Sequence, residues 1–163
     1  MDDHLHQLSQ CLGEQLLQRN WRIATAESCT GGGVAAAITA IPGSSAWFEY
    51  GIVSYANAAK EKLLGVSSET LAREGAVSEA VVIEMARGVL ALSGADIAVA
   101  ISGVAGPSGG SVEKPVGTVW FAWATAAGEI KTELKRFDGD RAAIQRQAVS
   151  FALTKLLEVS EPK

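Results

Sequence analysis

The chain has few cysteines, few histidines and no long apolar run, and each shortage excludes a class of protein. Its two cysteines, Cys11 and Cys29, are too few for a disulfide framework or a set of metal ligands, so we expect a reduced, cytoplasmic protein without a metal. Gly, Ser or charged residues break the apolar runs well before the roughly 18 residues that a membrane-spanning helix needs. The N-terminus is acidic and no apolar segment follows it, so the sequence predicts neither a membrane span nor a signal peptide.

Basic residues are also scarce. Fourteen Lys and Arg stand against eighteen Asp and Glu, which gives a formal net charge of −4. Affinity for nucleic acid comes largely from neutralised phosphates, and a chain without a basic run cannot supply it, so we predict no nucleic-acid partner. A small anionic ligand needs only one or two cations or a helix N-terminus, and that class of ligand stays open.

The hydrophobic fraction of 48% over 163 residues is enough for one domain with a buried core. We expect a single domain over residues 1–163, frayed at 1–4 and 159–163. Periodicity and turn residues predict helices over 5–19, 29–41, 44–50, 58–64 and 67–74, a longer helix capped by Ser78, and a final helix after Asp140. Strands are predicted over 21–26, 51–55 and 96–102, followed by a hairpin of 116–126 and 129–137.

This order predicts a three-layer α/β domain, with a mixed, mostly parallel sheet and helices on both faces. Three loops rich in Gly or polar residues follow the first three strands. The carboxyl ends of strands are where open α/β sheets bind ligands, so we expect the functional residues there.

A serine hydroxyl needs a neighbouring base before it can act as a nucleophile. Both histidines, His4 and His6, lie in the expected N-terminal tail, so the nearest candidate base is Lys60. Ser45, expected in the first turn of a short helix, is the first candidate nucleophile, since backbone N–H groups there could stabilise an oxyanion. The alternative interpretation is that Ser45 caps the helix and Lys60 is a solvated lysine.

Ser28 is the second candidate nucleophile, because it also lies between a strand and a Gly-rich helix start. It could instead cap that helix. Cys29 has no histidine to activate it and is interpreted as a buried structural thiol. Tyr55 could relay a proton or hold a substrate, and Asn57 could orient an amide, although a half-buried strand residue and a helix cap are the alternatives.

The loop of residues 103–110 could approach a phosphate with its bare backbone N–H groups. It is neither a Walker A loop nor a dinucleotide-binding signature, because the required Gly-Lys-Ser/Thr and Gly-x-Gly-x-x-Gly patterns are absent. Arg141, at the start of the last helix, could clamp a phosphate or pair with a carboxylate such as Asp138.

Taken together, these segments resemble the nicotinamide-nucleotide amidase family, also known as the CinA C-terminal domain family, in its stand-alone form. Any one matching segment is weak, but the six occur in family order across most of the chain. They are 26–32 (AESCTGG), 43–48 (GSSAWF), 53–60 (VSYANAAK), 75–79 (GAVSE), 101–107 (ISGVAGP) and 114–118 (KPVGT).

The resemblance implies hydrolysis of nicotinamide mononucleotide to nicotinate mononucleotide and ammonia, in pyridine nucleotide recycling, by a serine–lysine mechanism without a cofactor. It places the nucleophile at Ser45, the base at Lys60 and an assisting hydroxyl at Tyr55. Expected substrate-binding residues are Ser28, Gly31, Gly32, Asn57, Ser102, Gly103, Gly106 and Arg141. A non-catalytic nucleotide-binding module and a hydrolase of another small amide remain alternatives. Trp47 and Phe48 are expected either in the core or at the interface of a homo-oligomer, and stacking on an aromatic ligand is the less favoured alternative.

Overall fold

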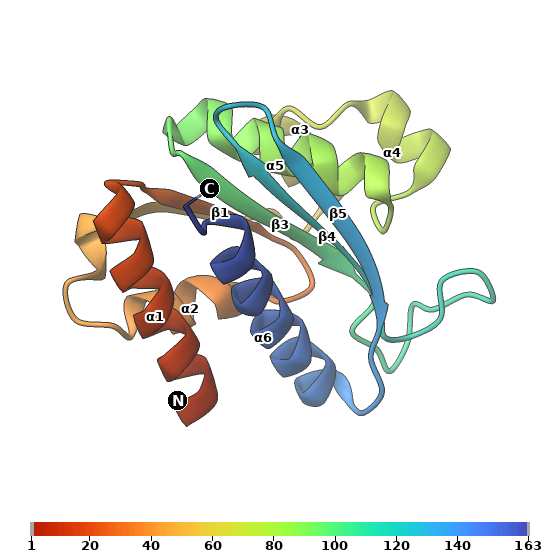
Figure 1. Ribbon diagram of the computed structural model, residues 1–163. Coiled ribbons are helices and arrows are strands. Elements are labelled where there is room, and N and C mark those ends of the chain that lie inside the picture. The colour runs from red at the N-terminus through yellow and green to blue at the C-terminus, as the bar shows by residue number, and fades with distance from the viewer. Residues whose placement is uncertain (1, 163) are drawn as a thin grey trace.

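Five strands form one open sheet that lies between two layers of helices (Figure 1). The computed structural model describes residues 2–162. The helices are α1 (Asp3–Arg19), α2 (Gly33–Thr39), the 3₁₀ turn η1 (Ser44–Ala46), α3 (Asn57–Leu64), α4 (Ser68–Glu74), α5 (Glu79–Ser93) and α6 (Arg141–Val159). The strands are β1 (Ile23–Glu27), β2 (Phe48–Val53), β3 (Ile97–Gly103), β4 (Thr118–Thr125) and β5 (Ile130–Arg136).

The strand order is β2-β1-β3-β4-β5. β1 pairs in parallel with both β2 and β3, whereas β4 is antiparallel to both β3 and β5. Four strands therefore run in one direction and β4 alone runs in the other, which confirms the predicted mixed, mostly parallel sheet. As a result, the carboxyl ends of β1, β2 and β3 meet at one edge.

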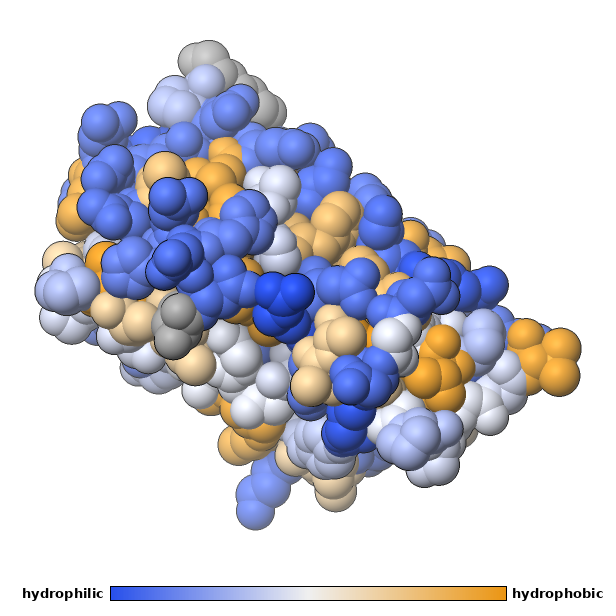
Figure 2. Space-filling view, turned by 90° about the horizontal axis from the view of Figure 1, so that it is seen from below, coloured by the Kyte–Doolittle hydropathy of each residue, from blue (hydrophilic) through white to orange (hydrophobic). Residues whose placement is uncertain are grey.

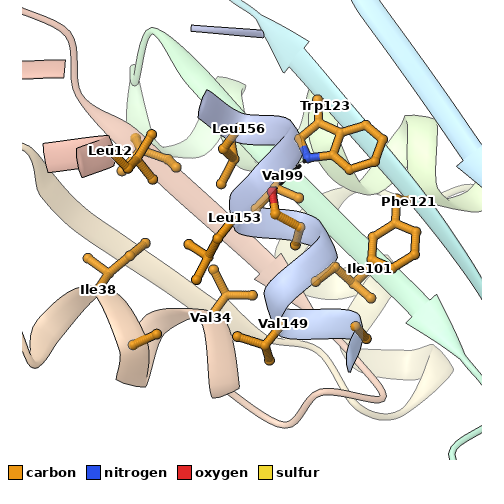
Figure 3. Close-up of a cluster of buried hydrophobic side chains, with 14 of the residues drawn as sticks. Leu12, Val34, Ile38, Val99, Ile101, Phe121, Trp123, Val149, Leu153 and Leu156 are labelled. Atoms are coloured by element: carbon orange, nitrogen blue, oxygen red, sulfur yellow. Dashed lines mark hydrogen bonds between the residues drawn. The ribbon is translucent and has the colours of Figure 1, made fainter. Parts of the chain in front are cut away.

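Larger apolar side chains occupy the sheet face that α1, α2 and α6 cover. On β3 these are Ile97, Val99 and Ile101, none of which is exposed. Phe121 and Trp123 extend this face onto β4, with their rings stacked 5.6 Å apart. Figure 3 shows these strand side chains beneath Val149, Leu153 and Leu156 of α6, with Leu12 of α1 and Ile38 of α2 completing the cluster.

Alanines occupy the opposite face of the sheet, which α3, α4 and α5 cover. They are Ala24 and Ala26 of β1, Ala98 and Ala100 of β3, and Ala122 and Ala124 of β4. Small side chains let α5 lie close to the strands, and Val82, Met85 and Val89 of α5 fill the layer between them. The alternation of large and small residues along β3 and β4 therefore places different helices on the two faces.

Both chain ends are more ordered than we expected. Asp2 caps α1 by accepting the N–H of His4, and it pairs with Arg146 of α6. Ser160, directly after α6, is fully buried, and its hydroxyl accepts a bond from Gln15. The expected fraying of residues 1–4 and 159–163 is thus not seen in residues 2–4 and 159–160; Met1 and Lys163 lie outside the described residues. Within residues 2–162, no helix has both the length and the apolarity needed to cross a bilayer.

The segment before α3 differs from the prediction. The helix expected over 44–50 is limited to η1, and the strand expected over 51–55 begins already at Phe48. The reason is pairing with β1, since the N–H of Ile23 donates to the carbonyl of Trp47. The Trp47 side chain is 1% exposed and packs over Gly13, where a Cβ would lie 2.7 Å from the indole. Trp47 is therefore part of the core and cannot form the predicted oligomer surface.

Gly88 allows α5 to cross the end of α3, because a Cβ at this position would overlap with the backbone carbonyl of Leu64. Helix propensity alone predicts that Gly88→Ala stabilises the protein by about 1 kcal/mol. We expect the opposite sign, a loss of about 1–3 kcal/mol, because backbone cannot yield as a side chain can. Urea denaturation measures the difference, and a more stable variant would contradict this account of the α3–α5 crossing.

Candidate active site

A pocket of about 390 Å³ lies at the edge where β1, β2 and β3 end. Its volume is within the usual range for small-molecule sites. Its walls come from four loops and the start of α6, and they include Ser28, Cys29, Tyr55, Asn57, Lys60, Ala76, Val77, Ser102, Gly103, Val104, Ala105, Gly106, Ser108, Gly109 and Arg141. Most of the residues that sequence analysis selected thus meet in one pocket, although they are spread over more than 110 positions of the chain.

Lys60 is the chemical centre of this pocket. It lies on α3, is 1% exposed, and places its Nζ 3.0 Å from the Oγ of Ser28. The same amine donates to the carbonyl oxygens of Ser54 at 2.9 Å and Tyr55 at 3.2 Å. A buried amine thus has three oxygen partners, one of which is a serine hydroxyl.

Burial of Lys60 disfavours its charged form in comparison with an exposed lysine. Burial lowers the pKa of Lys60 below its ordinary value, because an ammonium loses its hydration, and the neighbouring Cys29 thiol opposes this effect. The two carbonyls can only accept, so they take two amine hydrogens. In a neutral amine, the lone pair is then free to receive the proton of the Ser28 hydroxyl.

A buried carboxylate builds the turn that carries Ser28. Glu27 is fully buried at the end of β1, and its oxygens accept the Thr30 hydroxyl at 2.6 Å, the N–H of Val34 at 2.9 Å and the N–H of Ala35 at 3.0 Å. It therefore satisfies backbone donors at the start of α2, where a negative charge is also favoured by the helix dipole. Glu27 orients the Ser28 turn and not Lys60.

Ser45 is not part of this pocket, which corrects the predicted pairing of Ser45 with Lys60. Ser45 lies in η1 and is exposed, before the start of β2, whereas Lys60 follows the end of β2. A strand of six residues separates them, which spans about 20 Å at 3.3 Å per residue. The hydroxyl beside the amine is that of Ser28. Ser28 comes after β1 and Lys60 comes after β2, and because these two strands are parallel, both residues lie at the same edge of the sheet.

Arg141 and Tyr55 meet at the mouth of the pocket. The Nη2 of Arg141 donates to the Tyr55 hydroxyl at 2.8 Å, and its Nη1 donates to the carbonyl of Gly106 at 2.6 Å. Tyr55 is 59% exposed, so its hydroxyl faces the opening. Arg141 pairs with neither Asp138 nor any other carboxylate among the described residues, which leaves its charge available to an anion.

The remaining predicted residues divide into two groups. Asn57, Ser102, Gly103 and Gly106 line the pocket. Gly31 and Gly32 do not; their φ angles of 60° and 99° instead shape the turn between Ser28 and α2.

Two wall residues, and one residue that bonds a pocket loop from outside the pocket, were not predicted from the sequence. Ala76 and Val77, between α4 and α5, form part of the wall, and the only signal for them was the segment 75–79 within the family pattern. Gln145 of α6 donates to the carbonyl of Cys29 at 2.9 Å, and no feature of the sequence pointed to it. Among residues 2–162, no group of three or more His, Cys, Asp or Glu side chains is arranged to hold a metal ion.

The fold and site define a three-layer α/β protein with a serine and a buried lysine in a pocket at the strand ends. The model of the CinA C-terminal domain matches residues 5–160, and the chain belongs to this family. It is 59% identical over 155 residues to "Nicotinamide-nucleotide amidohydrolase PncC" of Escherichia coli (strain K12), covering 95% of this chain and 94% of the relative. The protein of the same name from Pseudomonas putida is 54% identical over 157 residues, covering 96% and 98%.

A solved structure supports the same assignment. The competence-damaged protein (CinA) superfamily protein from Klebsiella pneumoniae 700603 superposes with a TM-score of 0.92 at 49% identity. The match covers 96% of this chain and 97% of that chain. The predicted family and fold are both confirmed.

Cys29 provides a test of the pocket's interior. Burial raises the pKa of its thiol to about 12, and the residue is 5% exposed, whereas Cys11 is exposed on α1. We expect iodoacetamide to alkylate Cys11 in the folded protein and Cys29 only after unfolding, because the thiolate is the reactive form. Peptide mass spectrometry reads out both sites. Rapid alkylation of Cys29 in the native protein would contradict the buried turn.

Proposed function

We propose that the protein is a serine amidohydrolase that converts nicotinamide mononucleotide to nicotinate mononucleotide and ammonia, in pyridine nucleotide recycling. The observation that carries this proposal is the 3.0 Å contact between the Nζ of buried Lys60 and the Oγ of Ser28. Relatives at 54–59% identity over nearly the whole chain carry the name of nicotinamide-nucleotide amidohydrolase, which favours this substrate over other small amides.

In the proposed mechanism, Ser28 is the nucleophile and Lys60 is the general base. The neutral amine accepts the hydroxyl proton as Oγ forms a bond to the amide carbon. The protonated Lys60 then gives a proton to the leaving nitrogen, the C–N bond breaks, and ammonia departs. This leaves the pyridine carboxyl group esterified to Ser28.

Water completes the reaction. Lys60 is neutral again after ammonia has left, and it accepts a proton from a water molecule that attacks the ester carbon. Collapse of this second intermediate breaks the bond to Oγ, returns the proton to Ser28 and releases nicotinate mononucleotide. In both stages the Lys60 amine accepts a proton and then gives it up, so the mechanism requires no histidine and no metal.

The mouth of the pocket suits the phosphate end of the substrate. Arg141 supplies a guanidinium that no carboxylate of residues 2–162 neutralises, and the Tyr55 hydroxyl beside it can donate to a phosphate oxygen. Tyr55 thereby changes role, from the assisting acid that the family resemblance implied to a substrate-binding group. Asn57, at the first position of α3, and Ser102, at the end of β3, are proposed to orient the amide and ribose.

Two further expectations, the cellular compartment and the oligomeric state, remain proposals. Cys11 and Cys29 are both free thiols, which agrees with a reducing, cytoplasmic compartment.

A homo-oligomer is still proposed, but the buried Trp47 cannot form its interface. Edge strand β2, on which Tyr50 is 41% and Val53 is 47% exposed, is the better candidate. Figure 2 shows that the face seen from below is mostly hydrophilic, with apolar residues in separate small patches.

The choice of nucleophile is tested by two matched substitutions. We expect Ser28→Ala to lower ammonia release by at least about 1,000-fold, because the acyl intermediate can no longer form. Ser45→Ala is expected to keep turnover within about twofold of the wild type, because Ser45 lies at the other end of β2. Ammonia release from nicotinamide mononucleotide is the measurement, with circular dichroism to check the fold of each variant.

Three outcomes would count against the proposal. Loss of turnover in Ser45→Ala alone would return the nucleophile to Ser45. Saturable binding of nicotinamide mononucleotide by the wild type without ammonia release would indicate a non-catalytic binding module. Equal hydrolysis of free nicotinamide and its mononucleotide would indicate an amidase that does not use the phosphate.

The reaction should depend on the protonation state of Lys60. Only the neutral amine can act as a base, so kcat/KM should fall as the pH drops through the pKa of Lys60. Because burial lowers that pKa, the midpoint of this acidic limb should lie below the ordinary lysine value of 10.5. Values of kcat/KM measured across the pH range give the midpoint of the acidic limb.

Lys60→Arg should be inactive at every pH, since a guanidinium does not deprotonate. Retention of activity in this variant would exclude Lys60 as the base.

A further inference from the structure

The first two turns of α6 contact three of the four loops that form the pocket, namely the loops after β1, β2 and β3. Arg141 bonds the loops after β2 and β3, through the Tyr55 hydroxyl and the Gly106 carbonyl. Gln145, four residues later and so on the same side of the helix, bonds the loop after β1 through the carbonyl of Cys29. Figure 1 shows α6 lying on the sheet face opposite α5, so these contacts join the helix layer to the strand ends.

The contact of Gln145 is the one that reaches the nucleophile turn. Cys29 directly follows Ser28, and its carbonyl receives the Gln145 Nε2 at 2.9 Å. Among the described residues, no other donor bonds this carbonyl. Gln145 is half-buried, and its side chain does not line the pocket. It can therefore affect a reaction at Ser28 only through the position of the turn.

The other hydrogen bonds of the turn involve the residues around Cys29, and one of them, from the N–H of Gly31 to the carbonyl of Ser28 at 3.0 Å, spans Cys29 without engaging its carbonyl. The N–H of Ser28 donates to the carbonyl of Ile101 at 3.0 Å, and Thr30 is held by Glu27. Beyond Thr30 the chain continues into Gly31 and Gly32, which have the widest backbone freedom of any residue type. Gln145 is the side chain that holds the Cys29 carbonyl from outside the turn, and we expect its loss to let this peptide shift and to carry Ser28 with it relative to Lys60.

We propose that Gln145 is a positioning residue, which holds the turn after β1 so that the Ser28 hydroxyl stays within hydrogen-bond reach of the Lys60 amine. This inference rests on the proposed function for its kinetic consequence, but the geometry it assigns concerns only Ser28 and Lys60. A displacement of about 1 Å in a reacting group can cost on the order of 100-fold in rate.

The test replaces Gln145 by methionine, which keeps the length of the side chain and its helix propensity but removes the donor. We expect Gln145→Met to lower kcat for ammonia release by about 10- to 100-fold and to leave KM within about twofold, because no wall of the pocket changes. The rate at which an organophosphorus fluoride labels Ser28 should fall in the same proportion, since this probe depends on the same hydroxyl and base.

Gln147 provides a matched control on the same helix. Its Nε2 donates to the carbonyls of Asp138 and Ala143, so Gln147→Met also removes side-chain hydrogen bonds near the start of α6, but none that reach a pocket loop. We expect this variant to keep wild-type kcat, KM and labelling rate. Thermal unfolding of both variants shows how much stability each substitution costs.

The outcomes separate positioning from a purely structural role. Equal losses of kcat and stability in both variants, or a Gln145→Met enzyme within twofold of the wild type, would overturn the proposal. A rise in KM with unchanged labelling would do the same, because it would make Gln145 a binding residue. If the wild type releases no ammonia, the proposed function fails, yet slower labelling of Ser28 in Gln145→Met alone would still support the positioning role.

Discussion

The site depends on the burial of one amine. An ammonium at the depth of Lys60 would lose its water, and the two carbonyls that replace this water come from the end of β2, at Ser54 and Tyr55. The hydroxyl of Ser28 comes from the end of β1. The two strand ends are joined by the N–H of Ser54, which donates to the carbonyl of Glu27 at 2.9 Å. The parallel register of β1 and β2 therefore sets the distance between the base and the hydroxyl that it contacts.

The layer of small residues beneath α5 has a consequence for the same amine. α3 carries Lys60 and packs against α5, where Gly88 lets the two helices approach closely, while the alanines let α5 lie close to the strands. The larger side chains on the opposite face hold α6 farther out, where Arg141 and Gln145 span the distance to the loops with long polar side chains. The difference in residue size between the faces thus accompanies the buried Lys60 on one side and the less buried anchors Arg141 and Gln145 on the other.

Much of the fold could be predicted because the local signals agree with one another. The alternation on β3, the caps at Ser78 and Asp140 and the hairpin after residue 116 each appear in the structure close to their expected bounds. The segment from Ser44 to Tyr55 could not be predicted in this way, because pairing with β1 extends β2 toward its N-terminus and the core takes up Trp47. Contacts such as that of Gln145 with Cys29, separated by 116 positions, depend on tertiary packing and leave no local pattern.

Ser28, and not Ser45, lies beside Lys60, and one physical rule explains this arrangement. Both serines follow glycine-rich turns of similar composition, so local chemistry cannot separate them. Topology can, because in parallel strands every residue that follows a strand lies at one edge of the sheet and every residue that precedes a strand lies at the other. Ser28 and Lys60 both follow strands, whereas Ser45 precedes one. A lysine base can activate only a hydroxyl at its own edge, so the direction of β2 favours Ser28 over Ser45 as the nucleophile of the proposed mechanism.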